Sequence, residues 1–195
     1  MSNSLWSGNR PKTDDEARVR LCEAALECVR RIGFEKTTMS DIAKETGAAR
    51  PTLYKHFKSK TDVLFAAIDS CTLAFAGEVV RHASRFATYE ERVVEMILYV
   101  VTELPRHRHL SLIFDEQCAV QLRARAFSDE ATLVFSQMTA APLIELRPDL
   151  EGVGVEITEM MARFAISMIL FPGRYATDED GLRRLIERRV LPGLE

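Results

Sequence analysis

The side chains best placed to do chemistry in this sequence are basic residues that share one acid-free stretch. No Asp or Glu lies between positions 45 and 62, and that stretch holds four cations: Arg50, Lys55, Lys58 and Lys60. A dense group of positive charges favours contact with a polyanion such as nucleic acid. The alternative is a solvated helix face that has no partner.

The charge balance along the chain favours the polyanion. Residues 1–60 carry 12 Lys and Arg against 8 Asp and Glu, whereas residues 61–195 carry 14 against 21. All six lysines lie within the first 60 positions. The formal net charge of −3 therefore hides a basic N-terminal part, and the charge criterion for a nucleic-acid binder applies to that part alone.

Patterns typical of catalysis or metal binding are absent from the sequence. It contains no GxSxG, HExxH, P-loop or GxGxxG pattern, so we expect neither enzymatic activity nor a cofactor. We expect no metal site, because the arginines repel a cation in the run Arg106-His107-Arg108-His109. Paired spacing is also lacking among the cysteines, which are typical of reduced thiols in the cytoplasm: Cys22, Cys28, Cys71 and Cys118.

Composition predicts a helical globular protein. The chain is 47% hydrophobic and 28% charged, and it has only 9 Gly and 7 Pro among 195 residues, so few turns are available. The longest apolar stretch, about eight residues from Phe164 to Phe171, is too short to span a membrane. The first 16 residues lack the apolar run of a signal peptide. We therefore expect a cytoplasmic protein without a membrane segment.

Apolar spacing and capping signals predict a chain of helices and no strands. Thr38-Met39-Ser40-Asp41 and Ser59-Lys60-Thr61-Asp62 both have the form of a capping box, and Gly33 and Gly47 are suited to helix C-termini. The fold class is all-α, with helices expected at 14–32, 39–46, 50–57, from about 60 through 75, 89–104, 109–127, 129–146, 155–171, and after about 180 to the residues before Pro192.

The second and third of these helices have the form of a helix-turn-helix. Ile42 and Ala43 supply apolar and small residues for the helix crossing, and Gly47 suits the turn between the helices. Leu53 and Phe57 would anchor the second helix in the core, which leaves its basic residues free to enter a major groove. Any small helical hairpin could share this pattern.

The run GFEKTTMSDIAKETGAARPTLYKHFKSKTDVLFAAI, from Gly33 to Ile68, closely resembles the DNA-binding region of the TetR family of bacterial regulators. The resemblance covers about 50 residues, and the remainder agrees in architecture only. It implies a three-helix DNA-binding domain over 14–60 and a larger helical domain for ligand binding and dimerisation over 61–195. One departure is Ala49, where family members often have a serine cap.

The resemblance also implies roles for single residues. Tyr54 matches a tyrosine that contacts a phosphate, and Lys60 matches a lysine that favours a phosphate at a helix N-terminus. We expect base contacts from Arg50, Thr52 and Lys55, with Arg50 the leading candidate for a guanine. The other predicted DNA-binding residues are the hydroxyls of the preceding helix, the first-turn proline and a histidine that could instead cover the core edge: Thr38, Ser40, Pro51 and His56.

In the second domain the sequence suggests a ligand pocket and a homodimer interface. Bulky apolar side chains could line a pocket for an apolar or aromatic small molecule, although ordinary core packing explains each of them as well: Phe75, Met96, Tyr99, Phe114, Cys118, Met138, Met161 and Phe164. The two last helices could form a four-helix dimer interface or an intramolecular core, through Ile166, Ile169, Leu170, Leu182, Leu185 and Ile186.

These observations predict a transcriptional regulator. Our leading hypothesis is a repressor that binds a palindromic double-stranded DNA operator as a dimer and is released by a small molecule. An activator, or a regulator without a small-molecule ligand, fits the same residues. A helical protein-interaction module is a third hypothesis, in which the basic stretch serves a protein or RNA partner.

Overall fold

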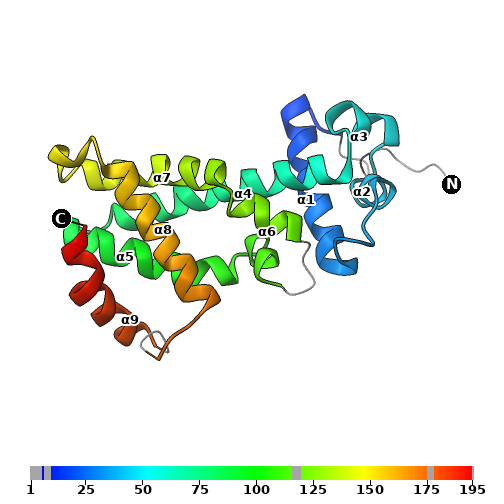
Figure 1. The fold of residues 1–195 in the computed structure, drawn as a ribbon. Helices are drawn as coiled ribbons and strands as arrows, with labels where there is room; N and C mark the ends of the chain where they lie inside the picture. The colour runs from blue at the N-terminus through cyan, green and yellow to red at the C-terminus, as the bar shows by residue number, and fades with distance from the viewer. Residues whose placement is uncertain (1–5, 7–9, 116–119, 175–177, 195) are drawn as a thin grey trace. The chain divides into compact units, whose positions relative to one another are not determined.

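The computed structural model describes residues 6, 10–115, 120–174 and 178–194. These residues form helices and no strands, which confirms the all-α class (Figure 1). The α-helices are α1 (Asp14–Ile32), α2 (Met39–Thr46), α3 (Arg50–His56), α4 (Lys60–Ala83), α5 (Tyr89–Glu103), α6 (Val120–Ala126), α7 (Asp129–Ile144), α8 (Gly154–Leu170) and α9 (Glu179–Leu185). Short 3₁₀ segments are η2 (Leu104–Arg106), η3 (Leu110–Phe114), η4 (Pro148–Leu150) and η6 (Leu191–Gly193), and η5 (Ile186–Val190) is a π-helical turn.

The chain forms two compact units. The first comprises Met1–Cys71 with Asp115–Ala126, and the second comprises Thr72–Phe114 with Phe127–Glu195. The division therefore falls inside α4 instead of at position 60, where the sequence placed it. Val63 and Leu64 have no exposed surface, so the start of α4 belongs to the first core. Helix α6 joins this unit through Arg125, whose guanidinium lies 2.7 Å from the carboxylate of Asp69.

Local capping explains where the first helices begin and end. The hydroxyl of Thr13 accepts a hydrogen bond from the backbone N–H of Glu16 (3.1 Å) at the start of α1. Thr38 and Asp41 form the predicted capping box of α2. Gly47 ends α2 at φ +68°, in the left-handed region that residues with a Cβ rarely adopt. The predicted helices over 14–32 and 39–46 are confirmed.

The core of the first unit joins the helix-turn-helix to α1. Leu21 of α1, Ile42 of α2, Leu53 of α3 and Phe57 have no exposed surface. Ile42 and Leu53 lie on the inner faces of their short helices, so the turn between these helices is held by burial on both sides. Isolated helices of seven or eight residues are marginal in water, and this shared core stabilises them.

The second unit is organised around α5, α7 and α8, and a buried arginine joins several of its segments. The guanidinium of Arg92 on α5 donates to the carbonyl of Phe86 (3.0 Å) and to the carbonyl of Pro142. It also pairs with the carboxylate of Glu145 at 2.9 Å. Arg92 is 6% exposed, so these partners compensate its charge where water does not reach.

Two predicted helices differ in the structure. The helix expected over 109–127 is replaced by η3 and α6, and positions 116–119 between them lie outside the described residues. Leu110 and Ile113, three residues apart, are both buried, which matches the period of a 3₁₀ segment. The expected last helix is regular only over α9 and continues as η5 and η6.

Helix α4 is the one helix, among the described residues, that is long and apolar enough to cross a membrane. Its 18-residue window has a mean hydropathy of 1.7, and 39% of that window is buried in the structure. Phe75, Ala76 and Val79 of α4 are almost fully buried, as are Val63 and Leu64. Core packing therefore accounts for part of the hydropathy of this helix.

Candidate nucleic-acid interface

Helix α3 has one buried and one exposed face. Leu53 is fully buried, whereas Arg50 and Tyr54, one turn apart, lie on the exposed side, and 48% of the Tyr54 surface is accessible. Pro51 is exposed in the first turn, where its missing N–H costs no hydrogen bond. The exposed face of α3 therefore presents a guanidinium and a phenol to solvent, as the sequence predicted.

The exposed and half-buried polar side chains of the helix-turn-helix fall into two groups. In the first group no side chain makes a hydrogen bond or ion pair to the part of the chain that the structure describes: Ser40, Arg50, Thr52, Tyr54 and Lys58. Arginine can donate two parallel hydrogen bonds to guanine, and hydroxyl and phenol groups can donate to phosphate. This first group is available for such contacts without losing an internal bond.

The second group is already engaged, and Thr38 is its clearest member. The Thr38 hydroxyl donates to the Asp41 carboxylate (2.6 Å) and accepts from the Asp41 backbone N–H (3.2 Å). These bonds to Thr38 lower the pKa of Asp41. The single hydroxyl proton of Thr38 is used in the capping box, so a phosphate contact would compete with that bond, and the DNA contact of Thr38 stays a prediction.

Lys60 is engaged in the same way. Its ammonium donates to the carbonyl of Phe34 (2.8 Å) and to that of Glu35 (3.4 Å), and it lies 4.4 Å from the centre of the Phe34 ring. Lys60 thus fastens the start of α4 to the loop between α1 and α2. Two of the three ammonium donors are thus bonded to backbone carbonyls, which gives Lys60 a positioning role, and its predicted phosphate contact stays a prediction.

The C-terminal end of α3 is held against α1. The ammonium of Lys55 lies 2.9 and 3.0 Å from the two carboxylate oxygens of Asp14, and this contact lowers the pKa of Asp14. Arg18 donates to the carbonyl of His56 (3.4 Å) and lies 4.4 Å from the centre of the Phe57 ring. His56 is half-buried beside Phe57. Lys55 and His56 therefore help to set the orientation of α3.

Sequence reasoning missed two residues of this unit. Arg18 clamps the end of α3, and nothing in the spacing of α1 distinguishes it from a solvated cation. Trp6 is 6% exposed, and its backbone N–H donates to the carbonyl of Gly47 (2.7 Å) in the turn of the helix-turn-helix. A large aromatic residue within a polar N-terminal stretch was the available signal for Trp6.

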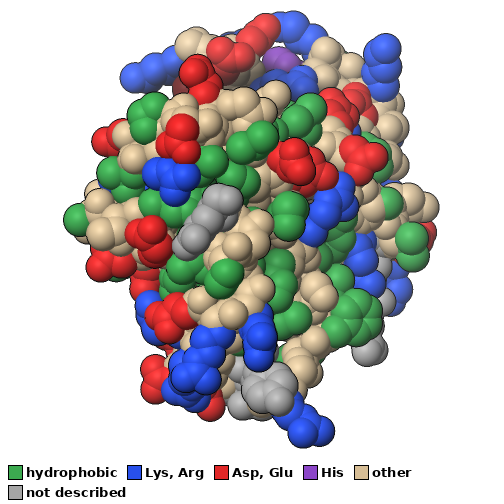
Figure 2. Space-filling view, turned by 60° about the vertical axis from the view of Figure 1, so that its left-hand side comes forward, with side chains coloured by type: hydrophobic (Ala, Val, Ile, Leu, Met, Phe, Trp, Pro, Cys, Tyr) green, Lys and Arg blue, Asp and Glu red, His purple; other side chains and the backbone are tan. Residues whose placement is uncertain are grey.

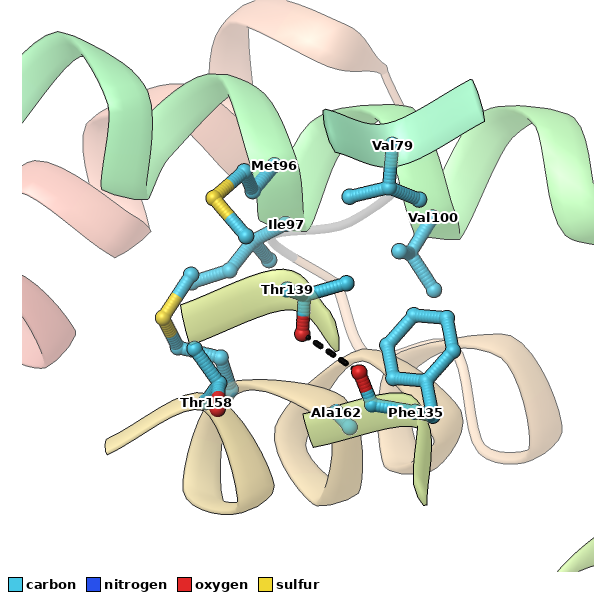
Figure 3. Close-up of a pocket in the computed structure, with 9 residues that line it drawn as sticks. Val79, Met96, Ile97, Val100, Phe135, Thr139, Thr158 and Ala162 are labelled. Carbon is cyan, nitrogen blue, oxygen red and sulfur yellow. Dashed lines mark hydrogen bonds between the residues drawn. The ribbon is translucent and has the colours of Figure 1, made fainter. Parts of the chain in front are cut away.

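A small cavity lies in the second unit, between α4, α5, α7 and α8. Figure 3 shows its walls, which are apolar apart from two threonine hydroxyls, and these donate to backbone carbonyls. The cavity volume is about 10 Å³, space for about one water molecule. The lining residues are Val79, Met96, Ile97, Val100, Phe135, Thr139, Thr158, Met161 and Ala162.

Two of the predicted pocket residues, Met96 and Met161, line this cavity. Phe75 and Tyr99 lie behind it, with ring centres 6.0 Å apart, and Phe75 is also 6.5 Å from the cavity residue Phe135. Phe114 contacts Phe127, Phe164 is half-buried, and neither lines the cavity. Met138 is 37% exposed, so α7 turns it toward solvent and the prediction for it is wrong. Cys118 lies outside the described residues.

Comparison with known proteins identifies the helix-turn-helix. Residues 21–67 match the family model of bacterial regulatory proteins of the tetR family. The regulator TtgR of Pseudomonas putida is 28% identical over 137 residues, which are 66% of this chain and 60% of TtgR. The chain thus spans about 60% of the length of the first curated relatives. The fatty acid metabolism regulator of Bacillus subtilis is 25% identical over 95 residues, 49% of each chain.

Solved structures match over most of the chain. The TetR family repressor AlkX from a Dietzia strain has a TM-score of 0.68 at 23% identity and covers 91% of this chain and 94% of its own. FadR from Bacillus subtilis in complex with stearoyl-CoA has a TM-score of 0.59 at 19% identity, with 87% and 97% covered. The helix-turn-helix region of this chain therefore matches the TetR family, and the chain shares its overall fold with solved structures of that family.

The TetR-family match bears on the basic stretch and on the class of activity. The matched residues run from within α1 to the first half of α4, so they include the whole helix-turn-helix, α2 and α3. TtgR, which the chain resembles over 137 residues, is described as an HTH-type transcriptional regulator. Among the described residues no group of three or more His, Cys, Asp or Glu side chains could hold a metal ion.

The predicted dimer residues divide between the core and the surface of the chain. Leu182 and Ile186 are 3% and 0% exposed in the single chain, which corrects their placement at an interface: both face inward in the second unit, where α5 contacts α9 and η5. Leu185, Ile166 and Ile169 are half-buried, and Leu170 is 37% exposed. Figure 2 shows one face of the molecule on which hydrophobic side chains form an extended area among charged ones.

Proposed function

We propose that this chain is a transcriptional repressor that binds a palindromic DNA operator as a homodimer and is released by a small apolar molecule. The observation that carries the DNA contact is the pair Arg50 and Tyr54. Both are exposed one turn apart on α3, and both lack partners among the described residues, while the opposite face of α3 is fully buried. A rigid helix with free donors suits a major groove.

The proposed homodimer rests on α8. Its outward residues Met160 and Leu170 are 51% and 37% exposed, and its N-cap residue Val153, seven positions before Met160, is 43% exposed, which is a heptad-like spacing. Phe171, directly after α8, is 76% exposed. A second copy of the chain would remove these apolar side chains from water. Two recognition helices in one dimer would also compensate for the few base contacts that one short helix makes.

The proposed release rests on the cavity of the second unit. Pockets for small molecules have volumes of about 300–1,000 Å³, so a ligand can enter here only if helices and side chains move apart. The cavity residue Val79 belongs to α4, and the same helix contributes Val63 to the core of the DNA-binding unit. A ligand that binds an open form of the second unit more tightly than the closed form would shift the population of the chain toward the open form.

Two relatives support an apolar ligand. The FadR structures from Bacillus subtilis and Thermus thermophilus are described as complexes with stearoyl-CoA and lauroyl-CoA. The walls of the cavity in this chain are apolar side chains with two methionines, which adapt readily to flexible ligands. We therefore propose a long-chain acyl or similarly apolar molecule as the ligand class.

The test is a selection of duplex DNA from a random pool with the purified protein, with its mass in solution measured in parallel. We expect an enriched palindrome bound by dimers, with half-sites about one helical turn or a multiple of it apart. Stearoyl-CoA added to the complex should release the DNA. In transcription in vitro from a promoter that carries the palindrome, the protein should lower transcript yield, and stearoyl-CoA should restore it.

Each step of this test can contradict one part of the proposal. A folded dimer that enriches no sequence would refute operator binding and favour a protein-interaction role. A rise in transcript yield would make the protein an activator. Enrichment without release by stearoyl-CoA would reject the acyl ligand and leave the operator assignment intact.

A further inference from the structure

The segment that precedes α1 is fastened at both ends of the recognition helix. At one end Trp6 donates its backbone N–H to the carbonyl of Gly47 (2.7 Å), in the turn that leads into α3. At the other end Asp14 pairs with Lys55 (2.9 Å), in the last turn of α3. Residues 10–13 therefore lie between two attachment points on either side of α3, a helix only about 10 Å long.

Trp6 is a strong attachment point. It is 6% exposed, and it is the only tryptophan of the chain. Its φ of +62° lies in the left-handed region, which a bulky residue rarely occupies unless the surrounding contacts hold it there. Burial of the indole and the bond to Gly47 provide such contacts.

Two cations between the attachment points have no role in the fold. Arg10 and Lys12 are exposed, and neither side chain has a hydrogen bond or ion pair to the described part of the chain. The backbone between them is restricted, because Pro11 has a fixed φ and limits the residue before it. The backbone N–H of Lys12 donates to the carboxylate of Glu16 at 2.7 Å. Both cations are thus carried by an ordered backbone.

The acids that follow balance these cations only in part, because Glu16 also interacts electrostatically with Lys12. Asp14 is paired with Lys55, and Glu16 is paired with Arg20. Asp15 is the remaining acid of the first turn of α1, where the helix dipole favours a negative charge. Arg10 and Lys12 together therefore leave an excess of positive charge beside α3.

We infer that Arg10 and Lys12 form a second DNA contact, in which both side chains bind backbone phosphates next to the base pairs that α3 meets. The inference rests on the proposed function, since it assumes that α3 enters a groove. Phosphate contacts of this kind set the register of a protein on the duplex and carry no sequence information. Trp6, whose backbone N–H is bonded to the carbonyl of Gly47, acts as the positioning residue.

The test measures the affinity for the selected duplex, and for a random duplex of equal length, over a range of salt concentrations. For the Arg10→Ala/Lys12→Ala double variant, the slope of log K against log salt should fall in magnitude by about 0.9 per lost phosphate contact, hence about 1.8 per protomer, on both duplexes. The control is Arg85→Ala/Arg174→Ala. It removes the same charge from two exposed residues of the second unit and should keep the wild-type slope.

The positioning role of Trp6 is tested by combining its substitution with the double variant. Trp6→Ala should lower the slope as the double variant does, the triple variant should lower it no further, and Trp6→Phe should restore it. A Trp6→Ala protein that loses thermal stability but keeps its slope would reduce Trp6 to a core residue and overturn its positioning role.

The remaining outcomes are equally distinct. A wild-type slope in the folded double variant would overturn the phosphate contact while operator binding stands. A reduction confined to the selected duplex would also overturn it, because it indicates base reading. If the wild-type protein binds neither duplex, the proposed function fails and this inference fails with it.

Discussion

Arg50 differs from its basic neighbours Lys55 and Lys60 in the partners that its charge has in the folded chain. Lys55 is bound to Asp14, and Lys60 is bound to two carbonyls and an aromatic ring. The Arg50 guanidinium has no such partner within the described chain. These basic residues carry the same charge but differ in role: Lys55 and Lys60 stabilise the fold, whereas Arg50 is available for contact with DNA.

The first prediction concerns this difference. Arg50→Ala should cost about 1–3 kcal/mol of binding free energy at one base pair of the operator and relax selectivity there, because a bidentate contact to guanine is lost. Competition binding to duplexes with each base pair replaced in turn measures this effect. An equal loss of affinity for every duplex would mean that Arg50 contacts phosphate instead.

Lys60 gives the complementary prediction. Lys60→Met should lower the free energy of unfolding by roughly 1–2 kcal/mol, because two bonds to carbonyls and the contact with the Phe34 ring are lost. Thermal unfolding followed by circular dichroism measures this, and the salt slope of DNA binding should stay unchanged. A slope reduced by about one with unchanged stability would support the phosphate contact predicted from sequence.

His107 gives a prediction about pH. Its Nδ1 accepts hydrogen bonds from the backbone N–H groups of His109 (3.3 Å) and Leu110 (3.2 Å), and burial lowers its pKa below the usual 6.5. The unfolded chain then binds a proton that the folded chain refuses, so this stabilisation is present above pH 6.5 and is lost as the pH falls.

Replacement of His107 tests its pH-dependent contribution to stability. His107→Asn keeps a side-chain acceptor but does not titrate. Its free energy of unfolding, measured with denaturant, should therefore fall less below pH 6.5 than that of the wild type. Parallel stability curves for the two proteins across that range would contradict the prediction.

At the scale of the helix, sequence succeeded where the signal is local. The helices over 14–32 and 39–46 follow from residues within them and next to them, such as Thr38, Asp41 and Gly47. The helix expected over 109–127 failed, because its interruption depends on burial of Leu110 and Ile113 and on distant partners. Periodicity marks a residue as apolar without indicating which neighbour it meets.

The same limit applied to the candidate site. The exposed face of α3 followed from its own sequence, but Thr38 was assigned both a cap and a DNA contact, two roles that compete for one hydroxyl proton. Met138 and Ile186 are equally apolar in the sequence, yet one is 37% exposed and the other fully buried. Only the packing of α7 and of η5 against other helices decides between these outcomes.

Helix α3 itself offers a prediction. Its N-cap residue Ala49 has extended backbone angles (φ −68°, ψ 141°) but no side chain that can cap. Ala49→Ser should raise the free energy of unfolding by about 0.5–2 kcal/mol, because a serine hydroxyl can accept a second hydrogen bond from the backbone N–H of Thr52, which donates to the carbonyl of residue 49 (2.9 Å). Thermal unfolding measures this, with Ala49→Val as a control that adds bulk without an acceptor. An equal effect of serine and valine would show that capping is not the cause.

For the whole molecule, the central relation is between the closed second unit and the proposed dimer. A cavity of about 10 Å³ leaves no room for an acyl chain, so ligand entry must rearrange the helices that surround it. Helix α8 lines the cavity through Met161 and exposes Met160 on another face. A ligand that displaces α8 would then also alter the surface proposed for dimerisation.

The last prediction tests that surface. Met160→Asp/Leu170→Asp should convert dimers to monomers, because two charges would be buried at the proposed interface, whereas the isolated chain exposes both positions and should keep its stability. Mass in solution and operator affinity should fall together, while Val120→Asp, at a position that is 81% exposed on α6, should change neither. Ile186→Asp, by contrast, should unfold the second unit. A double variant that remains dimeric would exclude this face of α8 from the interface.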